Sequence, residues 1–286
     1  MKKLIIGTAQ LGSKYGIANY SDKLSKKKLF QFLEFCYNNS LVSFDTASDY
    51  NSENILGEFI KKNNIQNISI STKIPSLKYV NKKNKLNFVR EVIDSSFNKL
   101  NINNLDTVFF HDENDIDFYQ SNEFDIVNIF KEYNIKNLGF SIYSKKIFNR
   151  LNKNKNVQSF QLPINIVNND FLKIKSNKKI IARSIFLQGI LISSKINTKN
   201  KILKNFNHKL IDFANEQKIN LYALCVNYIL KKKEINKFTV GFDNISQLKE
   251  LLRLKKYYKK IDRDIKLINK LITKDNYKKI IDPRKW

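Results

Sequence analysis

Residues 42–57 read Val-Ser-Phe-Asp-Thr-Ala-Ser-Asp-Tyr-Asn-Ser-Glu-Asn-Ile-Leu-Gly and contain one complete strand-to-helix unit. The stretch 42–46 is short, carries the apolar residues Val42 and Phe44 and ends in polar residues, and we expect it to form a strand. A short loop follows, and the apolar side chains of residues 55–60 then recur at helical spacing on one face. A strand followed at once by an amphipathic helix is the repeating unit of an α/β fold.

The same unit repeats along the chain. Short apolar runs alternate with longer amphipathic stretches, and this alternation predicts βαβ units and a parallel sheet. The expected strands are residues 4–8, 42–46, 68–73, 106–110, 137–140, 159–162, 180–183 and 237–240.

Two architectures fit this alternation, an open doubly wound sheet and a closed barrel. An open dinucleotide-binding sheet needs Gly-x-Gly-x-x-Gly after its first strand, and residues 7–12 (Gly-Thr-Ala-Gln-Leu-Gly) lack that spacing. Eight strands and 286 residues favour an α/β fold of the (β/α)8 TIM barrel type. We therefore expect one domain, residues 1–286.

The last third of the sequence is expected to be mostly helical. Residues 203–217 and 221–231 form two helical segments before the last strand, and one basic amphipathic helix is expected from 245 to 272. Residues 255–286 are interpreted as a C-terminal helical extension and tail.

The formal net charge is +26. Such a charge suggests nucleic acid or an anionic membrane as a partner, but the lysines are spread along the chain instead of forming one block. We favour a compositional bias and expect no nucleic-acid partner. A positive field would still attract a phosphorylated cofactor or an anionic substrate.

Cysteine, histidine and apolar content exclude several classes of protein. Cys36 and Cys225 lie far apart in apolar helical patterns, so buried free thiols are expected, and neither of the two histidines lies near them as a metal ligand would. No run approaches the roughly 20 apolar residues of a membrane span, and the apolar start is too short for an export signal. A cytoplasmic protein without metal, either a monomer or a weak homo-oligomer, is expected.

Polar side chains stand where three of the expected strands end. Asp45 lies at the end of the second strand and Lys73 at the end of the third, His111 follows the fourth, and Tyr50 comes shortly after Asp45. Because the carboxyl ends of barrel strands meet at one rim, these four side chains are expected to converge.

Each of the four suits the reduction of a carbonyl group. Tyr50 would donate a proton, and we expect the ammonium of Lys73 to lower the pKa of that phenol. Asp45 would keep a buried Lys73 charged. A neutral His111 would donate a hydrogen bond to the carbonyl oxygen and polarise it. Together they predict a proton-donating site for an oxygen that gains charge.

Three stretches, in order, resemble motifs of the aldo-keto reductases: residues 44–57, 71–73 and 109–112. The resemblance runs from Leu4 to about Leu252. It implies an NAD(P)H-dependent oxidoreductase that reduces an aldehyde or ketone, with a sugar or sugar derivative as one possible substrate class. The catalytic tetrad of that family falls on Asp45, Tyr50, Lys73 and His111.

The resemblance also implies a set of cofactor-binding positions. NADPH is the expected cofactor by general family habit. NADH stays the alternative, because Gly241 and Gln247 stand where NADPH-preferring members have Lys and Arg. Arg183 replaces the tyrosine that often stacks on nicotinamide in the family. The full set of implied positions is Thr8, Ser141, Gln161, Arg183, Ser184, Gly189, Gly241 and Gln247.

Several other residues are interpreted as having no catalytic role or an undecided one. His208 lies in a polar helical stretch and is expected at the surface, and Asp112 is expected to be a loop or capping residue. Residues 15–19 are expected either to line the substrate cleft or to have no role. Trp286 is expected either to cover the active-site mouth or to pack on the side of the barrel. Two other functions stay open: a cofactor-binding regulatory subunit of the same family, and a nucleic-acid binder.

Overall fold

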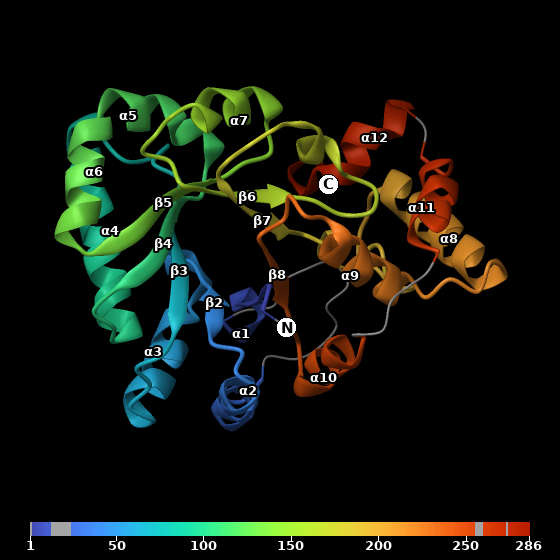
Figure 1. Cartoon of the computed structure of the whole chain (residues 1–286), viewed down its shortest axis with the longest axis horizontal. Helices are drawn as coiled ribbons and strands as arrows, with labels where there is room; N and C mark the ends of the chain where they lie inside the picture. Colours follow the sequence, from blue (N-terminus) through green and yellow to red (C-terminus); the bar gives the residue numbers. More distant parts are fainter. Residues whose placement is uncertain (1, 13–23, 255–259, 273) are drawn as a thin grey trace.

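The computed structural model describes residues 2–12, 24–254, 260–272 and 274–286. Within them, strands β1 to β8 follow in chain order and close into a parallel barrel, since β1 pairs with both β2 and β8 (Figure 1). This confirms the α/β class and the (β/α)8 TIM barrel. The strands are β1 (Leu4–Gly7), β2 (Ser43–Asp45), β3 (Ser69–Ile74), β4 (Leu105–Phe110), β5 (Ile135–Ser141), β6 (Ser159–Pro163), β7 (Lys179–Arg183) and β8 (Lys237–Gly241).

Helices surround the barrel (Figure 1). In the described residues the α-helices are α1 (Ala9–Gly12), α2 (Lys26–Asn38), α3 (Glu53–Lys62), α4 (Lys85–Leu100), α5 (Ile116–Ser121), α6 (Glu123–Glu132), α7 (Lys145–Asn152), α8 (Lys201–Glu216), α9 (Leu221–Lys231), α10 (Ile245–Arg253), α11 (Ile261–Asn269) and α12 (Lys274–Ile281). Short 3₁₀ turns that matter for the site are η1 (Ser48–Tyr50), η3 (Glu113–Asp115), η5 (Leu187–Gly189) and η6 (Pro283–Lys285).

Helix α2 shows how the sequence pattern becomes structure. Ser25 precedes it with an extended backbone, and its side chain accepts a hydrogen bond from a backbone N–H of the first turn. The buried face of α2 consists of Leu29, Phe32, Leu33 and Cys36, which recur at helical spacing. The Cys36 thiol is free, as is the buried thiol of Cys225 in α9, so both cysteines lie as expected.

Alternation along the strands separates two sets of apolar side chains. Leu4 and Ile6 belong to the large core between the barrel and its helices, whereas Ile5 forms a separate cluster with Phe109 and Ile181. Successive strand residues face opposite sides, so this second cluster fills the barrel interior. The interior is therefore packed, and a ligand must bind at its mouth.

The single helix expected at 245–272 is wrong. Helix α10 ends at Arg253 and α11 starts at Ile261, with residues 255–259 outside the described part of the chain. Each helix buries its own stripe, Leu248 and Leu251 in α10 and three isoleucines in α11. The helical spacing of apolar residues continues from α10 into α11, so the sequence pattern alone did not indicate that the helix ends between them.

The C-terminal segment returns to the barrel. Helix α11 contacts α9, α12 contacts α8, and the C-terminus lies near the ends of β6 and β7 (Figure 1). The turn η6 follows, and the indole N–H of Trp286 donates to the carbonyl oxygens of Lys279 and Ile280. Trp286 therefore packs on the end of α12 and is half-buried there.

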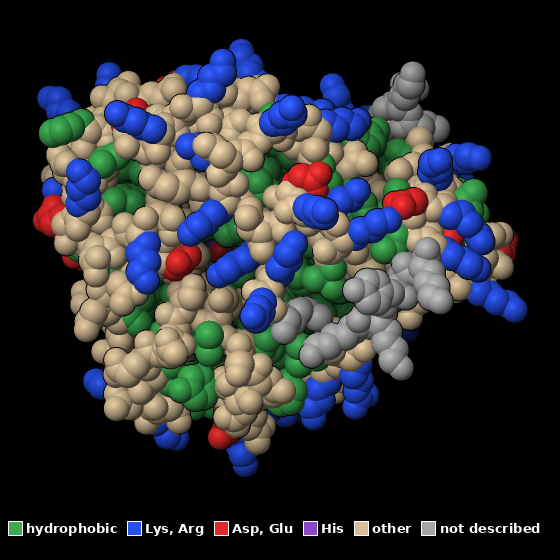
Figure 2. Space-filling view, viewed as in Figure 1, with side chains coloured by type: hydrophobic (Ala, Val, Ile, Leu, Met, Phe, Trp, Pro, Cys, Tyr) green, Lys and Arg blue, Asp and Glu red, His purple; other side chains and the backbone are tan. Residues whose placement is uncertain are grey.

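Lysine and arginine side chains are scattered over the face in Figure 2 without gathering on one element. This distribution agrees with the spread expected from the sequence. No helix of the described residues is long and apolar enough to cross a bilayer. Nor do the described residues bring together three or more side chains of the types that could bind a metal ion.

Candidate functional site

A cleft of about 870 Å³ opens at the carboxyl ends of the strands. This is where parallel barrels carry their ligands, and the volume lies in the range of small-molecule sites. Every residue that the sequence singled out as catalytic or cofactor-binding lines this cleft.

A buried ion pair forms the floor of the cleft. Lys73 lies two residues beyond Ser71, which is paired in register with Asp45, so both charged side chains face the same side of the sheet. The Nζ of Lys73 donates to Oδ1 of Asp45 at 2.9 Å and to the backbone oxygen of Thr46 at 2.6 Å. Lys73 and Asp45 are only 2% and 5% exposed, so each charge depends on the other.

Tyr50 lies directly above this pair. Its ring centre is 5.0 Å from Nζ of Lys73 and 6.1 Å from the ring centre of His111, with the two rings nearly perpendicular. The turn η1 presents Tyr50, and Asn51 ends that turn in the left-handed conformation with φ of 54°. Asp45, Tyr50, Lys73 and His111 therefore come together as the sequence predicts.

Gly12 allows the Tyr50 turn to approach α1. A β-carbon at position 12 would lie 1.6 Å from the backbone oxygen of Tyr50, so only glycine fits. The sequence shows a glycine at position 12, but its contact with Tyr50 depends on the tertiary fold.

The pKa of Tyr50 is raised, so the expected lowering by Lys73 is wrong for this arrangement. Burial of the phenol raises the pKa most, the Asp45 charge raises it further, and Arg183 acts in the opposite direction. Asp45 offsets part of the Lys73 charge, so the ammonium does not outweigh the burial of the phenol. Tyr50 consequently keeps its proton at neutral pH, as a proton donor must.

Burial and two nearby cations keep His111 neutral. Desolvation lowers its pKa most, Lys73 and Arg183 lower it further, and the result is a pKa of about 3. A neutral imidazole can donate one N–H to a carbonyl oxygen without carrying charge. His111 is therefore neutral at pH 7, as expected from its proposed role.

The depressed pKa of His111 predicts a pH-dependent stability. Between the ordinary pKa of 6.5 and about 3, the unfolded chain binds a proton at His111 that the folded protein does not. The free energy of unfolding should therefore fall by up to about 1.4 kcal/mol per pH unit as the pH drops below 6.5. Urea unfolding at pH 7, 6, 5 and 4 should show a steeper loss of stability in wild type than in His111→Asn, because the variant removes the His111 contribution and leaves those of other groups such as Asp115. His208→Asn, at an exposed position of α8, is the matched control, and equal slopes in all three proteins would contradict the assignment.

Three of the expected cofactor residues lie at the inner end of the cleft. Ser141 and Gln161 are neighbours in register on β5 and β6. The Gln161 amide donates to Oδ1 of Asp45 at 2.6 Å, while its buried Oε1 has no hydrogen-bond partner among the described residues. The hydroxyl of Thr8, fully buried after β1, bonds to that of Ser52 at 2.8 Å. An amide ligand placed here would satisfy the open acceptor of Gln161.

The loop after β7 carries an unusual backbone. Ser184, Leu187 and Gln188 have φ of 56°, 49° and 53°, and Gly189 has 94°. Positive φ costs non-glycine residues energy, and it often marks a ligand-binding segment, where turns of this kind point backbone N–H groups at an anion. Ser184 and Gly189 lie on this segment and line the cleft, and the Gly189 N–H donates to the backbone oxygen of Phe186 at 2.9 Å.

Gly241 and Gln247 form the other end of the cleft. A β-carbon on Gly241 would lie 2.0 Å from the amide oxygen of Gln10, so position 241 must be glycine while Gln10 stays there. The side-chain oxygen of Gln247 accepts from the backbone N–H of Asp243 at 2.8 Å. The strand end and the first turn of α10 are therefore tied together.

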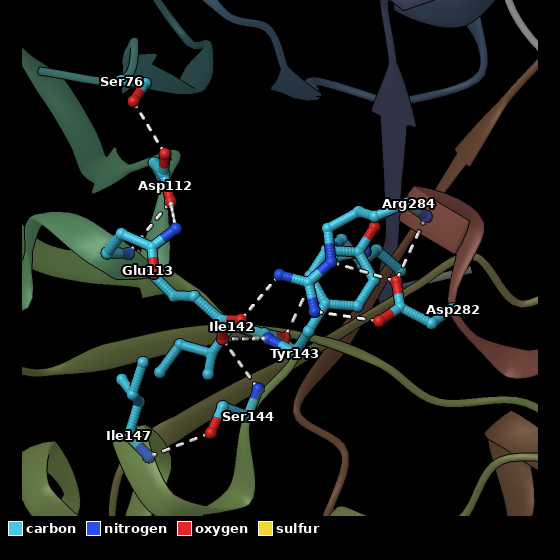
Figure 3. Close-up of polar contacts among 11 residues, drawn as sticks. Ser76, Asp112, Glu113, Ile142, Tyr143, Ser144, Ile147, Asp282 and Arg284 are labelled. Atoms are coloured by element: carbon cyan, nitrogen blue, oxygen red, sulfur yellow. Dashed lines mark hydrogen bonds and ion pairs between the residues drawn. The ribbon is translucent and has the colours of Figure 1, made fainter. Parts of the chain in front are cut away.

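Sequence reasoning missed a group at the outer rim of the cleft. Tyr143, Glu113 and Arg284 come from the segment after β5, from η3 and from the C-terminal tail (Figure 3). Oε2 of Glu113 accepts from the backbone N–H of Tyr143 and of Ser144, both at 2.7 Å, and Oε1 accepts from Arg284 at 2.6 Å. No motif marks these residues, because they meet only when the tail returns to the barrel.

Four further predictions concern Asp112, His208, residues 15–19 and Trp286. Asp112 caps η3 by accepting from the backbone N–H of Asn114, and His208 is exposed, as expected. Residues 15–19 lie outside the described residues. Arg284, not Trp286, is the tail residue that lines the cleft.

A family model for the aldo/keto reductase family matches residues 3–273. No curated protein matches this chain.

Solved structures similar to this chain share its fold at low sequence identity. An aldo-keto reductase from Bacillus halodurans in its holo form is 17% identical, with a TM-score of 0.71 over 95% of this chain and 92% of that one. The glycerol dehydrogenase from Gluconobacter oxydans is 14% identical, with 0.67 over 93% and 90%. A thermostable aldo-keto reductase in complex with the inhibitor epalrestat is 15% identical, with 0.67 over 95% and 96%.

Proposed function

Because this chain belongs to the aldo/keto reductase family, we propose that it reduces an aldehyde or ketone with NADPH or NADH. The observation that carries the proposal is the buried Lys73–Asp45 pair with the Tyr50 ring 5.0 Å above Nζ. A protonated phenol and a neutral imidazole then face the same small volume. Together they suit a carbonyl oxygen that gains negative charge.

The bound dinucleotide would supply hydride to the carbonyl carbon. The residues of the chain hold the oxygen and supply the proton. His111 donates a hydrogen bond to the carbonyl oxygen, and Tyr50 gives up its phenolic proton as charge develops on that oxygen. The Lys73 ammonium below the ring would offset part of the charge on the phenolate that remains, and Asp45 is the counter-ion of Lys73.

In this proposal the dinucleotide lies along the cleft of about 870 Å³. Ser141 and Gln161 would hold the carboxamide, since the buried Oε1 of Gln161 is an open acceptor. Thr8 would lie near the same end of the cofactor. Ser184 and Gly189 would lie beside the pyrophosphate, and Gly241 and Gln247 would lie beside the adenosine ribose.

The proposed preference is NADPH. The chain is strongly basic, which would attract the extra phosphate. The physiological partner would be a small carbonyl compound. The two buried free thiols fit a reducing compartment such as the cytoplasm.

Transfer of label from the cofactor tests the proposal directly. Purified protein is mixed with NADPH or NADH deuterated at C4 and a panel of aldehydes and sugars, and cofactor oxidation is followed at 340 nm. We expect turnover with deuterium on the carbinol carbon of the product, and a higher kcat/KM with NADPH. Cofactor binding without turnover on the whole panel would favour the regulatory-subunit alternative. Absence of cofactor binding would refute both.

A further inference from the structure

A stack of three side chains stands at the outer rim of the cleft. The guanidinium carbon of Arg183 lies 4.1 Å from the centre of the Tyr143 ring, and that of Arg284 lies 3.9 Å from it. Two guanidinium groups so close to one ring centre must lie on opposite faces. Figure 3 shows the Arg284 side chain over the Tyr143 ring, with Asp282 beside it.

The two arginines differ in how their charge is compensated. Arg284 donates from Nε and Nη2 to the carboxylate of Asp282, both at 2.9 Å, and from Nη1 to Glu113. Arg183 has no carboxylate partner among the described residues. Its Nη2 reaches only the backbone oxygen of Ile142 at 3.4 Å, and its buried Nε has no partner there.

Three carboxylates that line the cleft are already engaged. Glu113 accepts three hydrogen bonds, and Asp112 accepts from Ser76 and Asn114. Asp45 is paired with Lys73. A half-buried guanidinium without a counter-ion costs free energy, and a ligand that supplies one recovers it. Arg183 is also close enough to the reacting groups to lower the pKa of His111.

We propose that Arg183 binds the acid group of the substrate, so that the enzyme reduces carbonyl compounds bearing a carboxylate or phosphate. This rests on the proposed reductase function. Guanidinium groups match planar oxyanions with paired N–H donors, and such charge-assisted hydrogen bonds are stronger than neutral ones. The anion would replace the weak contact with Ile142, while the carbonyl oxygen lies between Tyr50 and His111.

Arg284 and Glu113 act as positioning residues in this arrangement. Glu113 holds the backbone of Tyr143 and Ser144, and Arg284 covers one face of the Tyr143 ring. The opposite face then supports the Arg183 guanidinium through a cation–π contact. The C-terminal tail therefore orders the anion-binding arginine without contacting the substrate's acid group itself.

Matched substrate pairs test the assignment. One pair is succinic semialdehyde and its methyl ester, and the other is glyceraldehyde 3-phosphate and glyceraldehyde. We expect wild type to prefer the charged member of at least one pair by tenfold or more in kcat/KM, about 1.4 kcal/mol. A preference within only one pair identifies carboxylate or phosphate as the acid group.

Arg183→Gln should bring the charged-to-neutral ratio close to one, chiefly through a higher KM for the charged substrate. Arg284→Gln should raise the same KM by a smaller factor. Arg90→Gln, which removes an equally charged but exposed residue of α4, should leave the ratio unchanged. If Arg183 acts only on Tyr50 or on the cofactor, Arg183→Gln would change both members of a pair equally, and the proposal would fail.

A binding measurement tests anion binding by Arg183 without requiring turnover. Calorimetry with the cofactor-loaded protein should show binding of succinate but not succinamide, lost in Arg183→Gln and kept in Arg90→Gln. Turnover of neutral and charged substrates with equal efficiency would overturn the acid-group proposal and leave the reductase function intact. Absence of turnover on every carbonyl, with succinate binding retained and lost in Arg183→Gln, would refute the reductase function and leave Arg183 only as an anion-binding residue. Absence of succinate binding together with no charged-substrate preference in wild type would overturn the acid-group proposal.

Discussion

Replacing Tyr50 with phenylalanine should lower kcat for carbonyl reduction by about 10²–10⁴-fold, the usual contribution of a positioned acid. The change removes one oxygen and leaves the ring over Lys73. Because burial raises the pKa of this phenol, Tyr50 is protonated at neutral pH, and its ring centre lies 6.1 Å from that of His111. Steady-state kinetics with a saturating cofactor would measure the loss.

The Tyr50→Phe experiment has a matched control and a clear contrary result. Tyr79 is 87% exposed, so Tyr79→Phe makes the same chemical change away from the cleft and should keep full activity. The cofactor Kd of Tyr50→Phe should stay within a few-fold of wild type. A variant that retains more than a tenth of wild-type kcat would show that another group donates the proton.

Replacing Lys73 with methionine should lower the free energy of unfolding by about 3–5 kcal/mol, as is usual when a buried ion pair loses one member. The carboxylate of Asp45 would remain buried, supported mainly by the Gln161 amide at 2.6 Å. Activity should be lost as well, because no cation would remain under the Tyr50 ring. Urea unfolding followed by circular dichroism would measure the change in stability.

Two comparisons isolate the burial of the Lys73–Asp45 pair. Lys231→Met breaks an ion pair with Asp262 in which both side chains are exposed, and it should cost less than about 1 kcal/mol. The double variant Lys73→Met with Asp45→Asn removes both charges and should recover most of the lost stability. A double variant as unstable as Lys73→Met would mean that packing, not the stranded charge, causes the loss.

The strands were predictable from sequence because each is a short apolar run bounded by polar residues. Their positions shift by at most two residues at each end between expectation and structure. The four rim residues were predictable for a related reason: a parallel barrel places every strand end at one mouth, so strand-end polar residues must meet. The helix at 245–272 was not predictable in detail, because its period continues across the break.

The pKa of Tyr50 could not be predicted from the sequence. Lys73 was expected to lower the pKa of Tyr50, but burial of the phenol and the nearby Asp45 charge raise it. A pKa depends on desolvation and on distances to all neighbouring charges, and neither quantity is contained in a motif.

The barrel and the four residues at its mouth could be predicted because both follow from local periodicity and from strand order. Which charges lack a counter-ion among the described residues depends on how the elements pack. Arg183 and Arg284 are 101 positions apart in the printed sequence, and they share the Tyr143 ring only because the tail folds back over the barrel. Contacts between such distant segments depend on how whole elements pack, and local residue patterns carry no record of that packing.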